Sequence, residues 1–302
     1  MLSLHTNAAA LSAQNSITRT QTSLSTSMTR LSTGYRINSA MDDAAGLQIA
    51  TRLKSQTSGM AVAMRNTQNS ISMLQTAEGA LDEVTNILTR MKDLATQAAD
   101  GSSSGDDQMS MQAEFDSLND ELANIMGNTK FGGTALLAKT AGKLEAASGI
   151  QFQIGADGAE TMTGAFKTEL DKVHADIKLA STKYDGDGAV GGGGGKEISD
   201  TATTPDTGAT NANGTITKLA TAIDSVSSLR SKIGAVSNRL DHVYNNLANV
   251  STNTKNATGR IMDVDFATES SNMTSNQMLL QAGTAMLKQT NSMSSMVMSL
   301  LQ

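Results

Sequence analysis

The sequence predicts a mainly α-helical protein: a long antiparallel helical bundle or coiled coil built from both chain ends, with a small β-hairpin region and a short variable segment. Two observations lead to this prediction. Several segments carry apolar residues every seven positions, with a second set three places later, as in a coiled-coil seam. The 302 residues also include a single proline, Pro205, so no proline interrupts a helix on either side of it.

The N-terminal segment keeps a seven-residue apolar period, and the C-terminal segment does the same. The residues of the two predicted terminal seams are Ala10, Ile17, Leu24 and Leu31 near the start, and Leu279, Met286, Met293 and Leu300 near the end. Four seam residues in a helix gain roughly 6–12 kcal/mol on burial, whereas ordering about 30 residues costs on the order of 45 kcal/mol. We therefore expect the ends to order only when partner chains cover them, and Leu287 to be sensitive to a buried charge.

Two adjacent acids, Asp42 and Asp43, follow the first of these segments. Ser39 precedes Asp42 by three residues, which is the spacing of a capping box, and both acids fall in the first turn of a predicted helix that carries Leu47. Carboxylates in a first turn meet unpaired N–H groups and the positive end of the helix dipole. We interpret Ser39, Asp42 and Asp43 as a helix cap and not as a catalytic pair.

The middle of the chain predicts two more helices joined by a turn at 100–107. The first seam consists of Leu74, Ala77, Leu81, Val84, Leu88, Met91, Ala95 and Ala98. The second, shorter seam consists of Met111, Phe115, Leu118, Leu122 and Ile125. Residues 150–154 then alternate apolar and polar before the turn at 156–158, which predicts a strand and a hairpin.

A helix is predicted at 166–179, followed by a linker or exposed loop at 185–214 that holds five consecutive glycines and the lone proline. The strongest seam follows. It consists of Leu219, Ala222, Val226, Leu229, Ile233, Val236, Leu240, Val243, Leu247 and Val250. Five successive heptads predict a helix over 215–250 that packs antiparallel against its neighbours.

Composition narrows the possible functions. The net charge of −6 disfavours a nucleic-acid partner, which needs a basic face to neutralise phosphates. The absence of cysteine excludes disulfides and thiolate metal sites. The first residues lack the basic and apolar regions of a secretory signal peptide, and no run of about 18 apolar residues exists. We expect no membrane span and no cleaved signal peptide.

The candidate chemical sites all fail on spacing. Gly191–Lys196 lacks two positions of the phosphate-loop pattern, and a linker explains it better. The three histidines, His5, His174 and His242, show no metal-ligand spacing, and a surface or seam position explains each. We therefore expect no enzyme activity and no cofactor.

Five blocks resemble the signature segments of bacterial flagellins. At the N-terminal end they are Arg30-Leu-Ser-Thr-Gly-Tyr-Arg-Ile-Asn-Ser-Ala-Met-Asp-Asp-Ala-Ala-Gly46 and Gln75-Thr-Ala-Glu-Gly-Ala-Leu81. Gln153-Ile-Gly-Ala-Asp-Gly-Ala-Glu-Thr161 resembles the family's hairpin. At the C-terminal end they are Ile261-Met-Asp-Val-Asp-Phe-Ala-Thr-Glu269 and Gln281-Ala-Gly-Thr-Ala-Met286, before the terminal Ser299-Leu-Leu-Gln302. The resemblance covers about 1–165 and 215–302. The short region between them, Ser294 and Ser295 near the end, and the start Met-Leu-Ser-Leu-His together resemble lateral, swarming-type flagellins.

The resemblance implies a structural subunit of the flagellar filament, exported through the organelle's own apparatus without a cleaved signal peptide and located outside the cell. It implies as partners further copies of the chain in a helical homopolymer, a flagellar export chaperone, and the cap and hook–filament junction proteins. It also implies recognition by host Toll-like receptor 5 through Arg90, Leu94 and Glu114. No nucleic acid, membrane or cofactor is implied.

The resemblance further implies a division of the chain into five parts. They are an inner filament-core helix at 1–43, a helical bundle with the hairpin at 44–165, a variable surface region at 166–214, a return helix at 215–258 and a second filament-core helix at 259–302. The alternatives are a hook–filament junction protein, which normally lacks so close an Asp-Asp-Ala-Ala-Gly block, and a secreted helical effector, which has no need of matching seams at both termini. A flagellin carrying an inserted protease is disfavoured by the missing H-E-x-x-H spacing.

Overall fold

A computed structural model of the protein describes residues 7–186, 195–199 and 208–300, and within 293–300 it describes the backbone alone. The chain divides into two compact units. The terminal unit comprises residues 1–57 and 251–302, and the central unit comprises residues 58–250. Two long helices contribute residues to both units. No helix in the described part of the chain is long and apolar enough to span a membrane.

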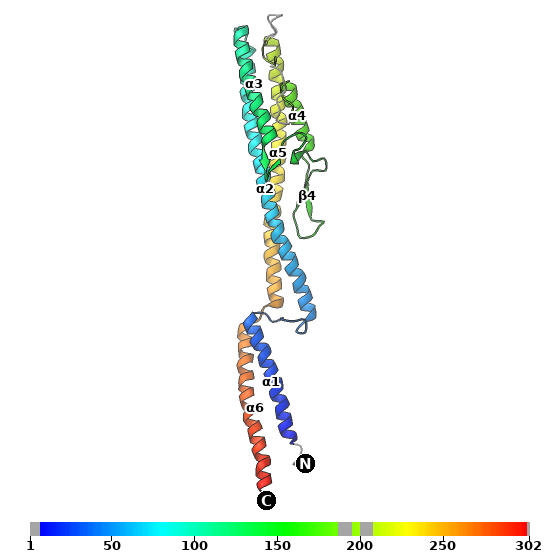
Figure 1. Ribbon diagram of the computed structural model, residues 1–302, viewed down its shortest axis with the longest axis vertical. Helices are drawn as coiled ribbons and strands as arrows, with labels where there is room; N and C mark the ends of the chain where they lie inside the picture. Colours follow the sequence, from blue (N-terminus) through cyan, green and yellow to red (C-terminus); the bar gives the residue numbers. More distant parts are fainter. Residues whose placement is uncertain (1–6, 187–194, 200–207, 301–302) are drawn as a thin grey trace. The chain divides into compact units, whose positions relative to one another are not determined.

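The described residues form six α-helices and two short antiparallel strand pairs, which confirms the predicted mainly α-helical fold (Figure 1). The helices are α1 (Ala8–Thr33), α2 (Ala44–Ala98), α3 (Gly105–Asn128), α4 (Lys167–Ala180), α5 (Gly208–Met262) and α6 (Phe266–Leu300). The strands are β1 (Lys130–Phe131), β2 (Thr134–Ala135), β3 (Ile150–Gln153) and β4 (Thr161–Gly164), with a short 3-10 helix at Lys143–Glu145.

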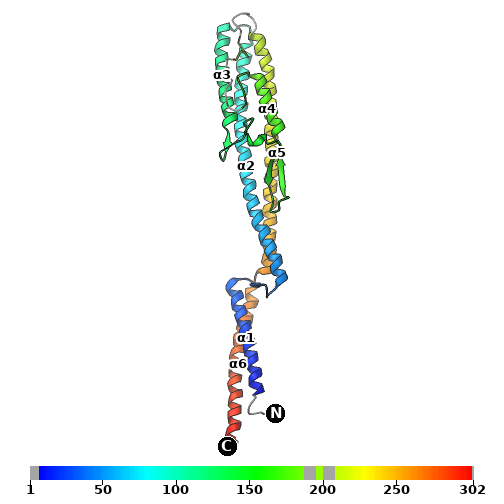
Figure 2. The same ribbon diagram turned by 45° about the vertical axis from the view of Figure 1, so that its right-hand side comes forward.

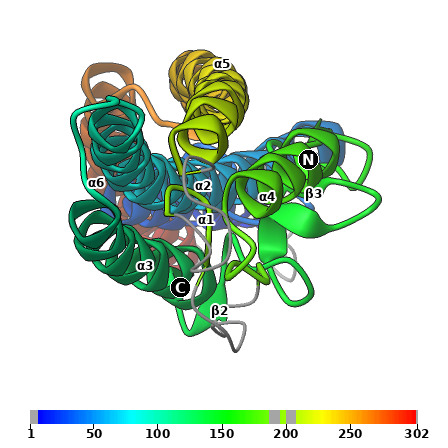
Figure 3. The same ribbon diagram turned by 90° about the horizontal axis from the view of Figure 1, so that it is seen from above.

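The core of the central unit consists of the predicted seams of α2 and α5. All eight seam residues of α2, from Leu74 to Ala98, are buried. The seam of α5 is buried as far as Leu240, after which Val243 and Leu247 are half-buried and Val250 is 38 % exposed. Viewed along the helices, α3 lies beside α2, and α4 lies beside α5 (Figure 3). The heptad pattern therefore identified the core-facing sides of both long helices.

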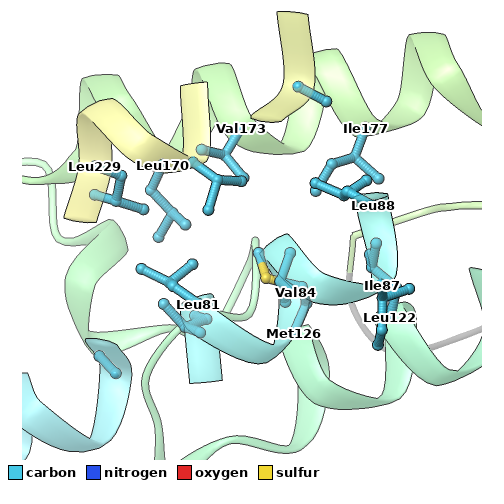
Figure 4. Packing of buried hydrophobic residues seen from close by; sticks show 14 of the residues in the cluster. Leu81, Val84, Ile87, Leu88, Leu122, Met126, Leu170, Val173, Ile177 and Leu229 are labelled. Carbon is cyan, nitrogen blue, oxygen red and sulfur yellow. The ribbon is translucent and has the colours of Figure 1, made fainter. Parts of the chain in front are cut away.

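Side chains from four helices meet in this core. In Figure 4 residues of α2 such as Leu81 and Leu88 point into the same space as Met126 of α3 and Val173 of α4. Leu229 of α5 also contributes to this cluster. Burying such a side chain stabilises the fold by about 1.5–3 kcal/mol. The central unit therefore has a continuous apolar core of its own.

The predicted seam of α3 packs against the core, although its residues are not all equally buried. Met111, Phe115 and Leu122 are buried as expected, but Leu118 and Ile125 are only half-buried. Asn119 is fully buried instead, and Met126 is fully buried one turn after Leu122. Leu118 and Ile125 still pack against the apolar core, so the predicted seam lies on the core-facing side of α3.

The predicted turn and hairpin are both present. Ser104 caps α3 in a reciprocal capping box with Asp107, after the turn that ends α2. The hairpin pairs Ile150 with Gly164 and Phe152 with Met162, so the alternating apolar residues face the core. The alternation over 150–154 thus predicted both the strand and its buried face.

The predicted loop at 185–214 is wrong over part of its length. Helix α5 begins at Gly208, so residues 208–214 of the predicted loop are helical. Residues 187–194 and 200–207 lie outside the described residues. The short segment 195–199 lies against the core: Ile198 is 0 % exposed, and its N–H donates to Oε1 of Gln112 at 2.9 Å. A glycine-rich run predicts a flexible loop, so the packing of the apolar Ile198 against distant helices was not predicted.

Candidate assembly surface

Helices α1 and α6 form an antiparallel pair in the terminal unit (Figures 1 and 2). Asn7 precedes α1, and its side-chain nitrogen lies 3.5 Å from the carbonyl oxygen of Thr290. At the other end of the pair, Arg30 lies 3.8 Å from the carboxylate of Glu269. The start of α1 therefore lies beside the end of α6, and each helix offers one face to the other.

The paired faces follow an alternating spacing of three and four residues. On α1 the half-buried or buried positions with this spacing are Ala10, Ala13, Ile17, Thr20, Leu24, Ser27 and Leu31, and Thr26 and Arg30 beside them are also half-buried. On α6 they are Glu269, Met273, Asn276, Leu280, Gly283, Leu287 and Thr290. This spacing is the a/d pattern of a two-helix coiled coil. The structure places all four predicted seam residues of α1 on this paired face.

The predicted seam of α6 lies elsewhere. Leu279 is 59 % exposed and Met286 is 66 % exposed, whereas their chain neighbours Leu280 and Leu287 belong to the paired face. Leu287 also lines a groove of about 520 Å³ between the two helices, opposite Leu11. The side chains of Met293 and Leu300 lie outside the described residues. The predicted heptad of Leu279 and Met286 is therefore not the register of the α1–α6 pair, whereas Leu287, also predicted as an assembly residue, belongs to the paired face.

Close approach of the two helices depends on a glycine. A Cβ atom at Gly283 would lie 2.9 Å from Cγ1 of Ile17, which is nearer than side chains normally approach. Most residues of the paired face are small or polar, and Ser27 is the one side chain of α1 that is buried. The isolated pair therefore buries little apolar surface, and packing of an amphipathic face supplies most helix stability in proteins.

A second apolar arc lies on α6 next to the paired face. The exposed residues of this arc are Met278, Leu279, Ala282, Ala285 and Met286, and we call it the outer arc. Spacings of three, four and seven residues place them on one side of the helix. The remaining side of α6 is polar, with Gln277, Gln281, Thr284 and Lys288. Since water would favour polar residues over the whole unpaired surface, the outer arc is suited to contact with another surface.

The connections between the helices hold the terminal unit together at its other end. Gly34 ends α1 with a φ of 77°, a left-handed conformation that glycine adopts at little cost. The chain then pairs with the α5–α6 connection: Val264 donates to the carbonyl of Gly34 at 3.0 Å, and Arg36 donates to the carbonyl of Ile261 at 3.0 Å.

The two adjacent acids support this connection in different ways. Asp42 accepts hydrogen bonds from the backbone N–H groups of Ser39 at 2.9 Å and Asn38 at 3.0 Å, which hold the pKa of its carboxyl below the usual 3.8. Asp43 precedes the first residue of α2 and accepts from the N–H of Gly46 at 2.8 Å. Asp43 therefore occupies the capping position of α2.

The predicted cap roles of Ser39 and Asp42 are wrong, because α2 begins only at Ala44: the hydroxyl of Ser39 donates to Asp42, and Asp42 accepts from backbone N–H groups that precede the helix. The glycine that ends the Asp-Asp-Ala-Ala-Gly block is explained by the same geometry. A Cβ at Gly46 would collide with the carboxylate of Asp43 and lie 2.9 Å from Cδ1 of the buried Ile37. Sequence reasoning missed Gly46 and Ile37 because neither carries a polar group.

Of the three residues implied in receptor recognition, two are exposed and one is buried. Arg90 donates two hydrogen bonds to one oxygen of Glu114, at 2.6 and 3.1 Å, and the two side chains are 56 % and 47 % exposed. Leu94 is 2 % exposed and belongs to the core of the central unit. Arg90 and Glu114 therefore share an exposed surface, whereas Leu94, which the resemblance implied beside them in recognition, faces inward.

The described residues contain no group of three or more His, Cys, Asp or Glu side chains that could hold a metal ion. His174 is buried, with Nε2 2.9 Å from the carbonyl oxygen of Leu137 and Nδ1 2.6 Å from the hydroxyl of Tyr184. It is a core residue whose two ring nitrogens both have partners, as a structural histidine requires.

Comparisons with known proteins give a consistent result. A family model described as the bacterial flagellin N-terminal helical region matches residues 4–142, and the corresponding C-terminal helical region matches residues 216–301. Flagellin A of Vibrio anguillarum is 35 % identical, with all of both chains covered. Flagellin B of the same organism is 34 % identical and covers 99 % of each chain.

Solved structures include relatives of the same kind. A crystal structure of Bacillus cereus flagellin is 33 % identical to the chain and covers 61 % of it and 88 % of that protein, with a TM-score of 0.44. The structure of a putative flagellar hook-associated protein from Vibrio parahaemolyticus covers 74 % of the chain and all of that protein, with a TM-score of 0.52. Its identity is only 16 %, so this similarity extends to the fold alone.

Proposed function

The chain belongs to the bacterial flagellin family, and from that premise we propose which of its surfaces build the filament. It is a structural subunit that polymerises with further copies of itself into the extracellular filament of the flagellum, and it is not an enzyme. The hook–filament junction protein and the secreted effector are not favoured, because full-length relatives at about 34 % identity are flagellins.

We propose that the paired face joins α1 to α6 within one copy and that the outer arc of α6 contacts neighbouring copies. The exposure of Leu279 and Met286 beside an already paired face is the observation that supports this division. In this proposal 1–43 and 259–302 form the filament core, 44–165 and 215–258 form the adjoining helical layer, and 166–214 lies toward the surface.

Replacement of Leu279 by aspartate tests the outer arc. A carboxylate enclosed by apolar helices is costly unless it is paired, so Leu279→Asp should abolish filament formation by the purified chain. The matched control is Leu179→Asp in α4, because Leu179 is 63 % exposed and lies in the central unit. Normal filaments from Leu279→Asp would refute the role of the outer arc.

We also propose that the terminal helices order fully only during assembly. Their paired face buries little apolar surface, whereas ordering a residue costs about 1–2 kcal/mol in backbone entropy. Neighbouring copies would supply the missing burial. Hydrogen exchange on the full-length monomer should show weak amide protection at about 1–40 and 262–302 and strong protection in the core of α2. Strong protection of all three segments would contradict the proposal.

The finer partners follow from family membership. We propose that the chain binds an export chaperone, the filament cap and the hook–filament junction proteins, and that it leaves the cell without cleavage of a signal peptide. Mass spectrometry of subunits from assembled filaments tests the last point, because an intact N-terminal segment is expected. Removal of a leader of 15–30 residues, the usual length of a secretory signal, would contradict it.

We propose that Toll-like receptor 5 recognises the monomer through Arg90 and Glu114, with Leu94 acting from the core by fixing the helix that carries Arg90. Arginine is favoured at interface anchors. Arg90→Ala monomer should activate receptor-bearing cells less than wild type while keeping its thermal midpoint. Leu94→Ala should lower that midpoint as well. Full activation by Arg90→Ala would remove Arg90 from the proposal.

A further inference from the structure

The sulfur atoms of the chain are distributed unevenly. The chain has 18 methionines and no cysteine, so thioethers are its only sulfur groups. Among the described side chains, the methionines more than half exposed are Met28, Met41, Met109, Met278 and Met286. Six others are buried: Met60, Met73, Met91, Met111, Met126 and Met162. Oxidation of methionine follows exposure, so the buried set is protected and the exposed set is not.

Two of the exposed thioethers belong to the outer arc. Met278 is 59 % exposed and Met286 is 66 % exposed, and both accompany Leu279 on the side of α6 that α1 leaves uncovered. Met41 is 96 % exposed, but it lies in the connection between α1 and α2. Met28 lies on α1 and Met109 on α3, so neither belongs to the arc on α6. Only Met278 and Met286 therefore combine exposed sulfur with the arc proposed to contact neighbouring copies.

We propose that Met278 and Met286 form a reversible oxidation site that controls entry of the chain into the filament. This inference rests on the proposed role of the outer arc. The oxidant is a two-electron oxidant of the hypochlorous acid class. The thioether sulfur gives two electrons to the chlorine of HOCl and gains its oxygen, so that thioether and HOCl yield sulfoxide, chloride and a proton.

The product differs from the thioether in a way that matters for packing. Sulfoxide is polar and carries a strong acceptor oxygen, whereas the thioether is a flexible apolar group. The other members of the outer arc are leucine and alanine side chains, which offer the new oxygen no donor, and the polar side chains on that side of α6, Ser275 and Gln289, lie only at its two ends. Enclosing such an oxygen without a hydrogen bond is unfavourable. An oxidised copy should therefore fail to join, and enzymatic reduction of the sulfoxide should restore it.

The exposure of the two thioethers determines at which stage of assembly oxidation can occur. Before assembly both thioethers are open to solvent, and after assembly the neighbouring copies that cover the outer arc protect them. Oxidation is therefore expected to stop growth without dissolving existing filaments. Leu279 has no oxidisable atom, so leucine at the two methionine positions should keep the apolar arc and remove the sensitivity.

The experiment measures the critical concentration for polymerisation of the full chain by sedimentation, before and after treatment of the monomer with hypochlorite. Treatment should raise it at least tenfold for wild type, and methionine sulfoxide reductases of both epimer specificities should reverse the change. The double variant Met278→Leu/Met286→Leu should assemble equally well before and after treatment. The matched control, Met41→Leu/Met109→Leu, should remain as sensitive as wild type. Equal inhibition of both double variants would overturn the proposal.

A second measurement needs no variant. Wild-type monomer is partly oxidised and allowed to polymerise, and peptide mass spectrometry compares sulfoxide in the pellet with sulfoxide in the remaining monomer. The pellet should be depleted of sulfoxide at Met278 and Met286, while Met41 and Met109 should show equal occupancy in both fractions. Equal occupancy at all four positions would overturn the proposal. Failure of untreated wild type to polymerise would instead refute the proposed function.

Discussion

Replacement of Ile198 by alanine should destabilise the central unit strongly, although Ile198 lies between two stretches rich in glycine and polar residues. The side chain is 0 % exposed and belongs to the apolar core. Its segment is also fixed by distant partners. The N–H of Ile198 donates to Gln112 of α3, and the carboxylate of Glu197 accepts from Gln112 at 2.9 Å and from the N–H of Thr182 at 2.8 Å.

The magnitude follows from the lost burial and the cavity left behind. Substitution of a buried isoleucine by alanine costs about 2–5 kcal/mol in free energy of unfolding. For a unit of 150–250 residues, 1 kcal/mol lowers the thermal midpoint by about 2–4 °C. Ile198→Ala should therefore lower the midpoint of the central unit by roughly 4–20 °C.

Thermal unfolding followed by circular dichroism is the assay, and Lys196→Ala is the matched control. Lys196 is exposed two residues earlier in the same segment, and exposed substitutions usually change stability by less than about 0.5 kcal/mol. Equal midpoints for Ile198→Ala and Lys196→Ala would refute the reasoning. They would instead support the prediction from the sequence that 185–214 is a linker or exposed loop.

Three further outcomes are expected. Gly283→Val adds atoms where a Cβ already lies 2.9 Å from Ile17, and overpacking of about 1–3 kcal/mol should raise the critical concentration for polymerisation; Gly79→Ala, which meets no atom within 4 Å, should assemble as wild type. Asn119 is buried with no hydrogen-bond partner for either amide atom among the described residues, so Asn119→Leu should raise the thermal midpoint, and a lower midpoint would contradict this. The depressed pKa of Asp42 means that ionised Asp42 contributes to folding stability above its ordinary pKa of 3.8, and that this contribution is lost as the pH falls through the lower pKa of the folded state. A titration midpoint for Asp42 at or above 3.8, measured by NMR, would contradict this.

The core of the central unit was predictable from the sequence because one simple rule decides it. In α2 and α5 the apolar residues repeat with one continuous heptad register, and in α2 the adjacent apolar positions Met73, Ile87 and Leu94 are buried in the same core. The full burial of Leu74, Leu81 and Leu219 follows directly from that pattern. The buried face of the first hairpin strand followed in the same way from the alternation of Ile150 and Phe152.

The register of α6 was not predictable because two registers are equally apolar. Leu279 and Leu280 are adjacent, as are Met286 and Leu287, so the sequence supports two heptads that differ by one residue. The register that packs against α1 depends on Ile17, which lies so close to α6 that only a residue without a side chain, Gly283, fits opposite it. A period within one helix carries no information about such a contact.

The predictions of a helix cap at Ser39 and of an exposed loop at 195–199 were wrong for related reasons. Ser39 satisfied the spacing of a capping box, but α2 begins only after Asp43, and local spacing does not fix where a turn ends. Ile198 is a single apolar residue among glycine and polar neighbours, so it has no period. Its burial depends on Gln112, 86 positions earlier in the chain.

The most direct test of the account is a cryo-electron microscopy map of filaments assembled from the purified chain. The account predicts that α1 and α6 remain paired through Leu280, Gly283 and Leu287, and that Leu279 and Met286 lie against side chains of neighbouring copies. A map in which the outer arc faces solvent or the filament channel, with neighbours contacting the polar side of α6 instead, would contradict it.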